Sequence, residues 1–130
     1  MVAHRLTNIP GSSAYFKGGI NAYANEVKID VLGVPEDILD KYGAVSPECA
    51  QEMAQAAGKL FKTDCAISVT GIAGPDGGTA DKPVGLVYIG ITTKGKTQIY
   101  KNNFIGNREK VRLRSAQMAL YYFYRIIECL

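Results

Sequence analysis

The chain has 130 residues, a formal net charge of +3 and 47% hydrophobic residues, values typical of one globular domain with a core of ordinary size. Lys and Arg are spread along the sequence instead of forming blocks, so we expect no nucleic-acid partner. No apolar stretch approaches about 18 residues and no leader pattern is present, so we expect neither a membrane partner nor secretion. Three separated cysteines and one histidine favour a reducing, cytoplasmic location, with no disulfide framework and no metal.

The first half of the chain contains several short predicted elements. Residues 3–16 read as a helix end stopped by a Pro-Gly pair and followed by a Ser-rich turn. Alternating apolar and polar residues after two glycines predict a strand over 18–24. Asn25 is then expected to cap a short helix over 26–33, and a proline start and a glycine stop predict another helix over 35–43.

The second half has stronger patterns. Ser46 followed by Pro and Glu marks a helix start, and apolar residues recur at helical spacing as far as Phe61. An apolar, β-branched run predicts a strand over 64–71. Two further runs around a Lys-Gly-Lys turn predict a hairpin over 84–104, and an amphipathic helix is expected from Asn107 to the end.

The order of these elements predicts the fold class. Helices lie between the strands predicted over 18–24 and 64–71, which favours a right-handed parallel crossover. The hairpin would extend the same sheet with antiparallel strands. We therefore predict an α/β layered domain with a mixed sheet.

A glycine-rich loop follows the strand over 64–71. In α/β sheets, ligands bind beyond the carboxyl ends of strands, and glycines let backbone N–H groups approach a phosphate or an oxyanion closely. The alternative is a plain surface loop, and no Gly-Lys-Ser/Thr follows to make a Walker A motif. The candidate ligand-binding residues here are Gly71, Ala73, Gly74, Gly77 and Gly78.

Several motifs together carry a resemblance to a known family. "VTGIAGPDGG" followed by "KPVGLVYIG", with "YFKGGINAYANEVKIDVLGV", "GAVSPECAQEMA" and "GNREKVRLRSAQMAL", resembles the CinA C-terminal domain family, the nicotinamide mononucleotide deamidases. The resemblance implies hydrolysis of the carboxamide of nicotinamide mononucleotide to nicotinic acid mononucleotide and ammonia, in pyridine nucleotide salvage, without a cofactor. It also implies a three-layer α/β/α sandwich with a mixed, mostly parallel sheet.

The sequence departs from this family at its start. The family pattern places a helix, a strand and an "AESCTGG"-type turn with the nucleophilic serine before a segment like residues 3–16, and this chain begins at that segment. We therefore expect residues 1–130 to be an N-terminally truncated domain, short of one interior strand between 18–24 and 64–70. The flanking strands would close up, another chain or fragment would fill the gap, or open edges would self-associate, so a homo-oligomer is expected.

Two residues match the catalytic pattern that the resemblance implies. Tyr23 and Lys28 lie in "YANEVK", which matches Tyr-x-Asn-Glu-x-Lys, and Asn25 in the same motif is a candidate substrate contact. A lysine close to a serine acts as its base when burial lowers the pKa of the amine. The alternatives are that Lys28 is a solvated surface amine and that Tyr23 only covers the sheet.

Two arginines are candidate phosphate ligands. Arg108 and Arg112 lie one helical turn apart behind the predicted cap Asn107, where guanidinium groups and a helix N-terminus favour an anion. The alternative is an ordinary exposed helix face. The leading hypothesis is an amidohydrolase with impaired turnover, and the alternatives are a nucleotide-binding remnant without turnover or one piece of a split or mis-started protein.

Overall fold

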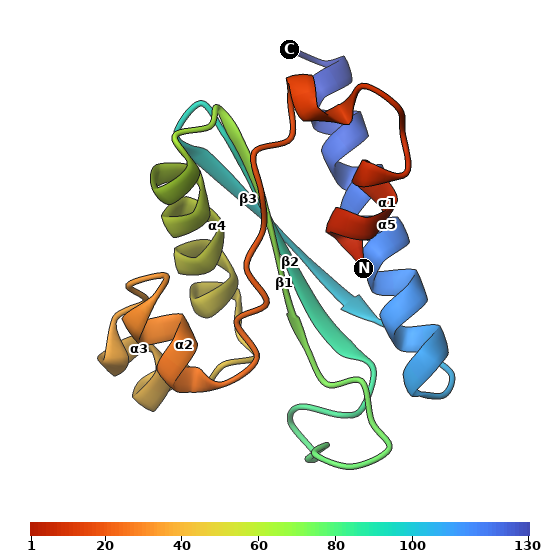
Figure 1. Cartoon of the computed structure of the whole chain (residues 1–130). Coiled ribbons are helices and arrows are strands. Elements are labelled where there is room, and N and C mark those ends of the chain that lie inside the picture. The colour runs from red at the N-terminus through yellow and green to blue at the C-terminus, as the bar shows by residue number, and fades with distance from the viewer.

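The computed structural model describes all residues, 1–130, as one α/β unit (Figure 1). Along the chain, four short helices are followed by one long helix, three strands and a long final helix. The elements are α1 (Val2–Thr7), the 3₁₀ helix η1 (Ser12–Ala14), α2 (Asn25–Asp30), α3 (Glu36–Tyr42), α4 (Pro47–Phe61), β1 (Cys65–Gly71), β2 (Leu86–Thr93), β3 (Lys96–Asn103) and α5 (Arg108–Glu128). None of the helices combines the length with the apolar composition that a membrane-spanning segment requires.

The two long helices begin where the sequence predicts. Ser46 accepts a hydrogen bond from the backbone N–H of Cys49 at 3.1 Å, which satisfies one free donor of the first turn of α4. Asn107 does the same for Lys110 at 3.0 Å at the start of α5. Both predicted caps are confirmed.

The sheet contains three strands in the order β1-β2-β3, and both pairings are antiparallel. Val69 lies opposite Ile89, which in turn lies opposite Tyr100. The predicted hairpin is confirmed: its turn, at Lys94 and Gly95, has φ values of 48° and 79°. The predicted α/β class is confirmed. The prediction of a mixed, mostly parallel sheet is wrong, because both strand pairs run antiparallel.

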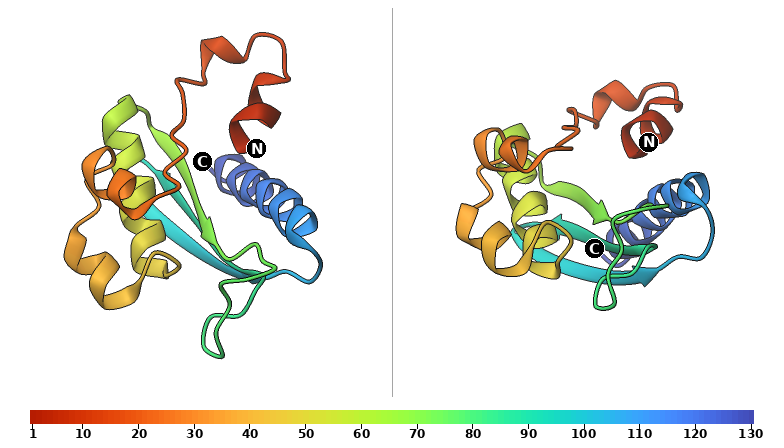
Figure 2. Two further views of the ribbon diagram at one scale, coloured as in Figure 1. Left: turned by 60° about the horizontal axis from the view of Figure 1, so that its bottom comes forward. Right: turned by 90° about the horizontal axis from the view of Figure 1, so that it is seen from below.

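The strand predicted over 18–24 does not form, and with it the parallel crossover is lost. Side chains in this segment do alternate between half-buried and exposed positions, which explains the pattern in the sequence. The backbone N–H groups of residues 17–22, however, donate no hydrogen bond. Alternation sets the faces of an extended segment, but a strand also needs a neighbour within hydrogen-bonding distance. Figures 1 and 2 show the segment passing beside β1 without joining the sheet.

The sheet lies between two helical layers (Figure 2). On one side, the hydroxyls of Ser68 and Thr70 donate to the carbonyls of Ala50 and Ala44, at 2.6 Å and 2.7 Å, and tie β1 to α4 and to the loop before it. On the other side, Val87, Ile89, Ile91, Val111, Ala119 and Ile126 form the larger core cluster, beneath α5. The three-layer arrangement predicted from the resemblance is therefore present.

The outer edge of β1 has no strand partner. Lys94 N–H donates to Asp64 O and Ile72 N–H to Leu86 O, both at 2.9 Å, so the even-numbered residues of β1 bond to β2. In an antiparallel pair the intervening residues direct their backbone groups to the opposite edge. Ile67 and Val69 therefore point N–H and C=O groups toward residues 17–22, which do not pair with them. The two extended segments have not closed up.

Candidate functional site

Three predicted site residues meet at the start of α5. Arg108 donates from Nη1 to the carbonyl oxygen of Gly74 at 2.8 Å and from Nη2 to the hydroxyl of Tyr23 at 3.4 Å. These residues come from α5, the glycine-rich loop and the extended segment before α2. The tertiary fold thus brings together side chains that are 85 positions apart in the sequence.

Lys28 lies on α2 and binds the backbone next to Tyr23. Its side chain is buried, with 6% of the residue exposed, and Nζ donates to the carbonyls of Ala22 at 2.8 Å and Tyr23 at 3.3 Å. No carboxylate pairs with it, since the single ion pair of the protein joins Arg125 to Glu128. The alternative that Lys28 is a solvated surface amine is therefore wrong: Lys28 holds the backbone that carries Tyr23.

Asn25 does not have its predicted role as a helix cap. It is the first residue of α2, Ala24 occupies the cap position, and no side chain accepts a hydrogen bond there. The cap prediction fails because the helix starts one residue earlier than the pattern indicates. Asn25 is exposed next to Tyr23, whose side chain is also exposed, at 79%.

The glycine-rich loop leaves the end of β1 and is closed at its base. Gly85 N–H donates to Ile72 O at 2.7 Å, next to the Ile72–Leu86 bond. Gly74 and Gly77 have φ values of 82° and 92°, a region that favours glycine. A Cβ on Gly78 would lie 2.8 Å from the backbone nitrogen of Val84, so the tip of the loop packs on its own return segment.

The loop keeps several backbone donors free. The N–H groups of Ala73, Gly74, Gly77 and Gly78 donate to no group of the chain. Gly71 and Ala73 lie beside α5, but Gly77 and Gly78 are at the exposed tip and do not line the hollow described next. The predicted ligand-binding glycines are therefore split between the base of the loop and its tip.

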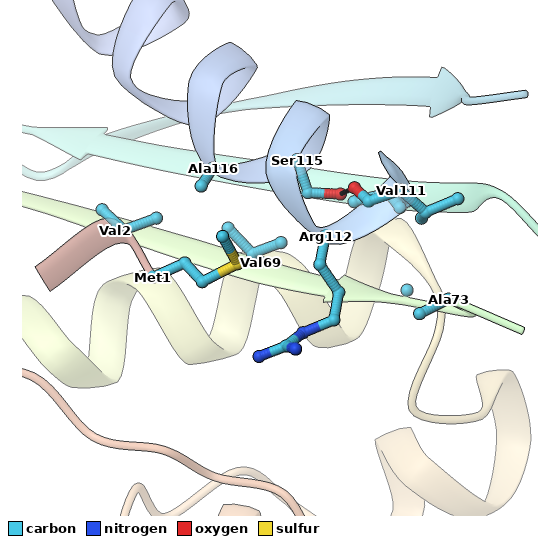
Figure 3. Close-up of a pocket in the computed structure, with 10 residues that line it drawn as sticks. Met1, Val2, Val69, Ala73, Val111, Arg112, Ser115 and Ala116 are labelled. Atoms are coloured by element: carbon cyan, nitrogen blue, oxygen red, sulfur yellow. Dashed lines mark hydrogen bonds between the residues drawn. The ribbon is translucent and has the colours of Figure 1, made fainter. Parts of the chain in front are cut away.

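A hollow of about 220 Å³ lies between α1, β1 and α5. Arg112 is its one charged lining residue and extends away from α5 (Figure 3), while the Ser115 hydroxyl donates to Val111 O at 2.6 Å. The volume is smaller than that of a typical ligand site, roughly 300–1,000 Å³, so the hollow accommodates only part of a ligand. The lining residues are Met1, Val2, Val69, Gly71, Ala73, Val87, Val111, Arg112, Ser115 and Ala116.

The sequence analysis missed the apolar part of this hollow. Val69, Val87 and Ala116 follow ordinary core patterns, and nothing in their spacing separates a pocket wall from a packed interior. Lys82 was also missed: its Nζ donates to Tyr42 O at 2.5 Å and ties the glycine-rich loop to the end of α3. No group of three or more His, Cys, Asp and Glu side chains forms a set of metal ligands.

The raised pKa values of two cysteine thiols lead us to expect that the folded protein loses stability in alkaline solution. Burial raises the pKa of the Cys49 thiol, against the opposing effect of Lys28, and burial together with Asp64 raises the pKa of Cys65. A thiol whose pKa is higher in the folded than in the unfolded chain favours folding while it is protonated. This stability is fully present below the pKa of the unfolded chain and is lost as pH rises through the pKa of the folded chain. We expect Tm to fall above about pH 9, the ordinary range of a thiol. Thermal melts of Cys49→Ala should fall less steeply with pH, and identical slopes would contradict this assignment.

A comparison with known protein families identifies the family to which the chain belongs. Residues 1–127 match the model described as the CinA C-terminal domain. This chain belongs to the CinA C-terminal domain family. The resemblance found in the sequence motifs is confirmed.

Curated relatives of this CinA C-terminal domain are longer proteins. It is 54% identical over 129 residues to a putative competence-damage inducible protein of Halothermothrix orenii, covering 98% of the chain and 31% of the relative. It is 50% identical over 125 residues to a protein of the same description from Moorella thermoacetica, covering 96% of the chain and 30% of the relative. The chain therefore spans about three tenths of the length of these relatives.

Solved structures share the architecture of this CinA C-terminal domain. The competence/damage inducible protein CihA from Agrobacterium tumefaciens superposes with a TM-score of 0.93 at 38% identity, covering 95% of this chain and 76% of that one. The competence damage-inducible protein A (ComA) from Klebsiella pneumoniae gives a TM-score of 0.94 at 31% identity, covering 98% and 79%.

Proposed function

We propose that this CinA C-terminal domain binds nicotinamide mononucleotide and serves the hydrolysis of its carboxamide to nicotinic acid mononucleotide and ammonia. The observation that carries the proposal is the meeting of Arg108, Tyr23 and Gly74 beside the hollow that Arg112 borders. The two guanidinium groups of Arg108 and Arg112 suit a phosphate, and the apolar hollow suits part of a pyridine ring.

The same residues suggest how the substrate is held for reaction. In hydrolysis through an acyl intermediate, a nucleophilic hydroxyl attacks the carboxamide carbon and its proton passes to the amide nitrogen. The free backbone N–H groups of Ala73 and Gly74 would donate hydrogen bonds to the tetrahedral oxyanion that forms. Ammonia then leaves, and water cleaves the acyl intermediate. Lys28 positions Tyr23 through the two backbone carbonyls that it binds.

We propose that turnover by this chain alone is weak. Ser115 is the one serine that lines the hollow, and its hydroxyl already donates to Val111 O inside α5. No base contacts that hydroxyl, whereas nucleophilic serines need an adjacent base. This observation favours the second candidate function, a nucleotide-binding domain that does not complete the reaction.

Two measurements separate these functions. Isothermal titration should detect binding of nicotinamide mononucleotide and at least about tenfold weaker binding of nicotinamide riboside, which lacks the phosphate. An ammonia-release assay on the same sample should show little turnover. Ready turnover would reject the binding-only function, and absence of binding would reject the site itself.

A further inference from the structure

Lys82 anchors the glycine-rich loop to the body of the domain. We call residues 72–78 the outgoing leg of this loop and residues 79–84 its return leg. Lys82 is half-buried, and its Nζ donates to the carbonyl oxygen of Tyr42, the last residue of α3. A lysine at this position satisfies a carbonyl that the end of the helix leaves free. The contact joins two segments that are 40 positions apart in the sequence.

The turn that receives this lysine is fixed on the sheet and on α4. Gly43 O accepts from the Ser46 hydroxyl at 2.8 Å, and Ala44 O accepts from the Thr70 hydroxyl at 2.7 Å. Ser46 caps α4, and Thr70 belongs to β1. Each of the three consecutive carbonyls of residues 42–44 therefore accepts a hydrogen bond from a side chain. The anchor point of the loop moves only with the core.

The return leg supports the outgoing leg through Val84. A Cβ on Gly74 would lie 2.5 Å from Val84 Cγ1, and a Cβ on Gly78 would lie 2.9 Å from Val84 Cγ2. Both glycines therefore lie directly against this valine, with no room for a side chain between them. Val84 follows Lys82 by two residues, and Thr79 N–H donates to Lys82 O at 2.8 Å, which holds the return leg in a turn.

Arg108 holds Gly74 from another element. Its Nη1 donates to Gly74 O at 2.8 Å and its Nη2 to the hydroxyl of Tyr23 at 3.4 Å. Neither Arg108 nor Lys82 is ion-paired with a carboxylate. The loop is therefore held by two cationic side chains, each bonded to a backbone carbonyl. These contacts form one continuous path from the end of α3 to Tyr23.

We propose that Lys82 is a positioning residue for the candidate site: it sets where the free N–H groups of Ala73 and Gly74 lie relative to Tyr23. This inference deepens the proposed function and rests on it, because those amides act on a substrate only if the loop receives one. A site that is ordered before its ligand arrives binds more tightly than one that has to be ordered on binding. Loss of the Lys82 anchor therefore weakens binding without removing any group that touches the ligand.

Backbone ¹⁵N relaxation measures the mobility of the loop without a ligand. The order parameters of Gly74 and Gly78 should be about 0.85 in the wild type, as in a rigid backbone, and should fall below about 0.6 in Lys82→Met. Lys82→Arg should restore them, because a guanidinium also donates to a carbonyl. Val84→Ala interrupts the same path at a residue that is 37% exposed, and it should mobilise Gly74 in the same way.

Lys41→Met is the matched control for the relaxation measurement. Lys41 lies in the last turn of α3 and is exposed, and its Nζ lies 5.2 Å from the centre of the Tyr42 ring and makes no hydrogen bond. Its substitution removes a charge from the same helix end and should leave the loop rigid. Unchanged order parameters of the loop in Lys82→Met would overturn the proposal. A change confined to α3 would do so too, because it is what a helix cap alone gives.

Isothermal titration with nicotinamide mononucleotide gives the second readout. We expect Lys82→Met to weaken binding about tenfold, Lys82→Arg to recover most of the wild-type affinity, and Lys41→Met to stay within about twofold. Far-UV circular dichroism verifies that each variant is folded. Wild-type affinity in Lys82→Met would overturn the proposal. A wild type that binds no nucleotide would overturn the proposed function instead, and the relaxation measurement would then decide by itself whether Lys82 orders the loop.

Discussion

Gly85→Ala will lower the free energy of unfolding by about 3 kcal/mol, the sum of a left-handed backbone penalty and steric overlap. Gly85 lies between the glycine-rich loop and β2, with φ at 95°. Its N–H donates to Ile72 O at 2.7 Å, and its carbonyl accepts from Phe104 N–H at 2.8 Å. A Cβ at this position would overlap the carbonyl oxygen of Phe104. The backbone on both sides of Gly85 is bonded, so it cannot move aside without losing these bonds.

Gly95→Ala is the matched control for this prediction. Gly95 also has a positive φ, 79°, but nothing lies within 4 Å of the position its Cβ would take. Its substitution should therefore cost only the backbone penalty, about 1 kcal/mol. Urea denaturation followed by circular dichroism measures both variants. Equal losses would show that contact with Phe104 contributes nothing.

Arg112→Met is expected to weaken binding of nicotinamide mononucleotide by about tenfold or more. A hydrogen bond to a charged group contributes about 1.5–3 kcal/mol, and each 1.4 kcal/mol corresponds to a factor of ten in affinity. Arg112 borders the hollow and makes no hydrogen bond in the protein, so its guanidinium is free to bind a phosphate. Methionine keeps much of the side-chain volume and removes only the charge and the donors.

Arg114→Met provides the comparison for Arg112. Arg114 lies two residues farther along α5, does not line the hollow, and donates to the carbonyl of Ile105 at 2.7 Å. Its loss should leave nucleotide affinity within about twofold of the wild type, because surface charges at a distance are screened by salt. Isothermal titration at one ionic strength measures both. If nicotinamide riboside loses as much affinity as the mononucleotide in Arg112→Met, the arginine does not bind the phosphate.

The open edge of β1 connects the fold to the proposed weak turnover. Ile67 and Val69 direct unpaired backbone groups toward residues 17–22, and the Arg108–Tyr23–Gly74 contacts lie beyond the ends of these two segments. Unpaired strand edges bind further strands readily. Two of the arrangements expected from the sequence therefore remain as proposals: a segment of another chain fills the gap, or the open edges associate with copies of the same chain.

The sequence by itself determined the local elements of this protein and the membership of its family. Some features depend only on hydrogen bonds and turns between residues that are close in the sequence. They include the helix caps at Ser46 and Asn107 and the hairpin over 84–104, and the local sequence is therefore enough to predict them. The motif around Tyr23 and Lys28 supplies the predicted catalytic residues through the family resemblance, and their roles stay a prediction.

Only the tertiary structure decided how these parts combine. Residues 18–24 have the alternation of a strand but no neighbour to bond. Lys28 is buried, and two carbonyl oxygens of the preceding segment accept hydrogen bonds from its Nζ. The contact of Arg108 with Tyr23 likewise depends on how α5 packs on the sheet. Strand pairing, burial and long-range contacts depend on residues that are distant in the sequence and meet only in the folded protein. The local periodicity of the sequence therefore cannot predict them.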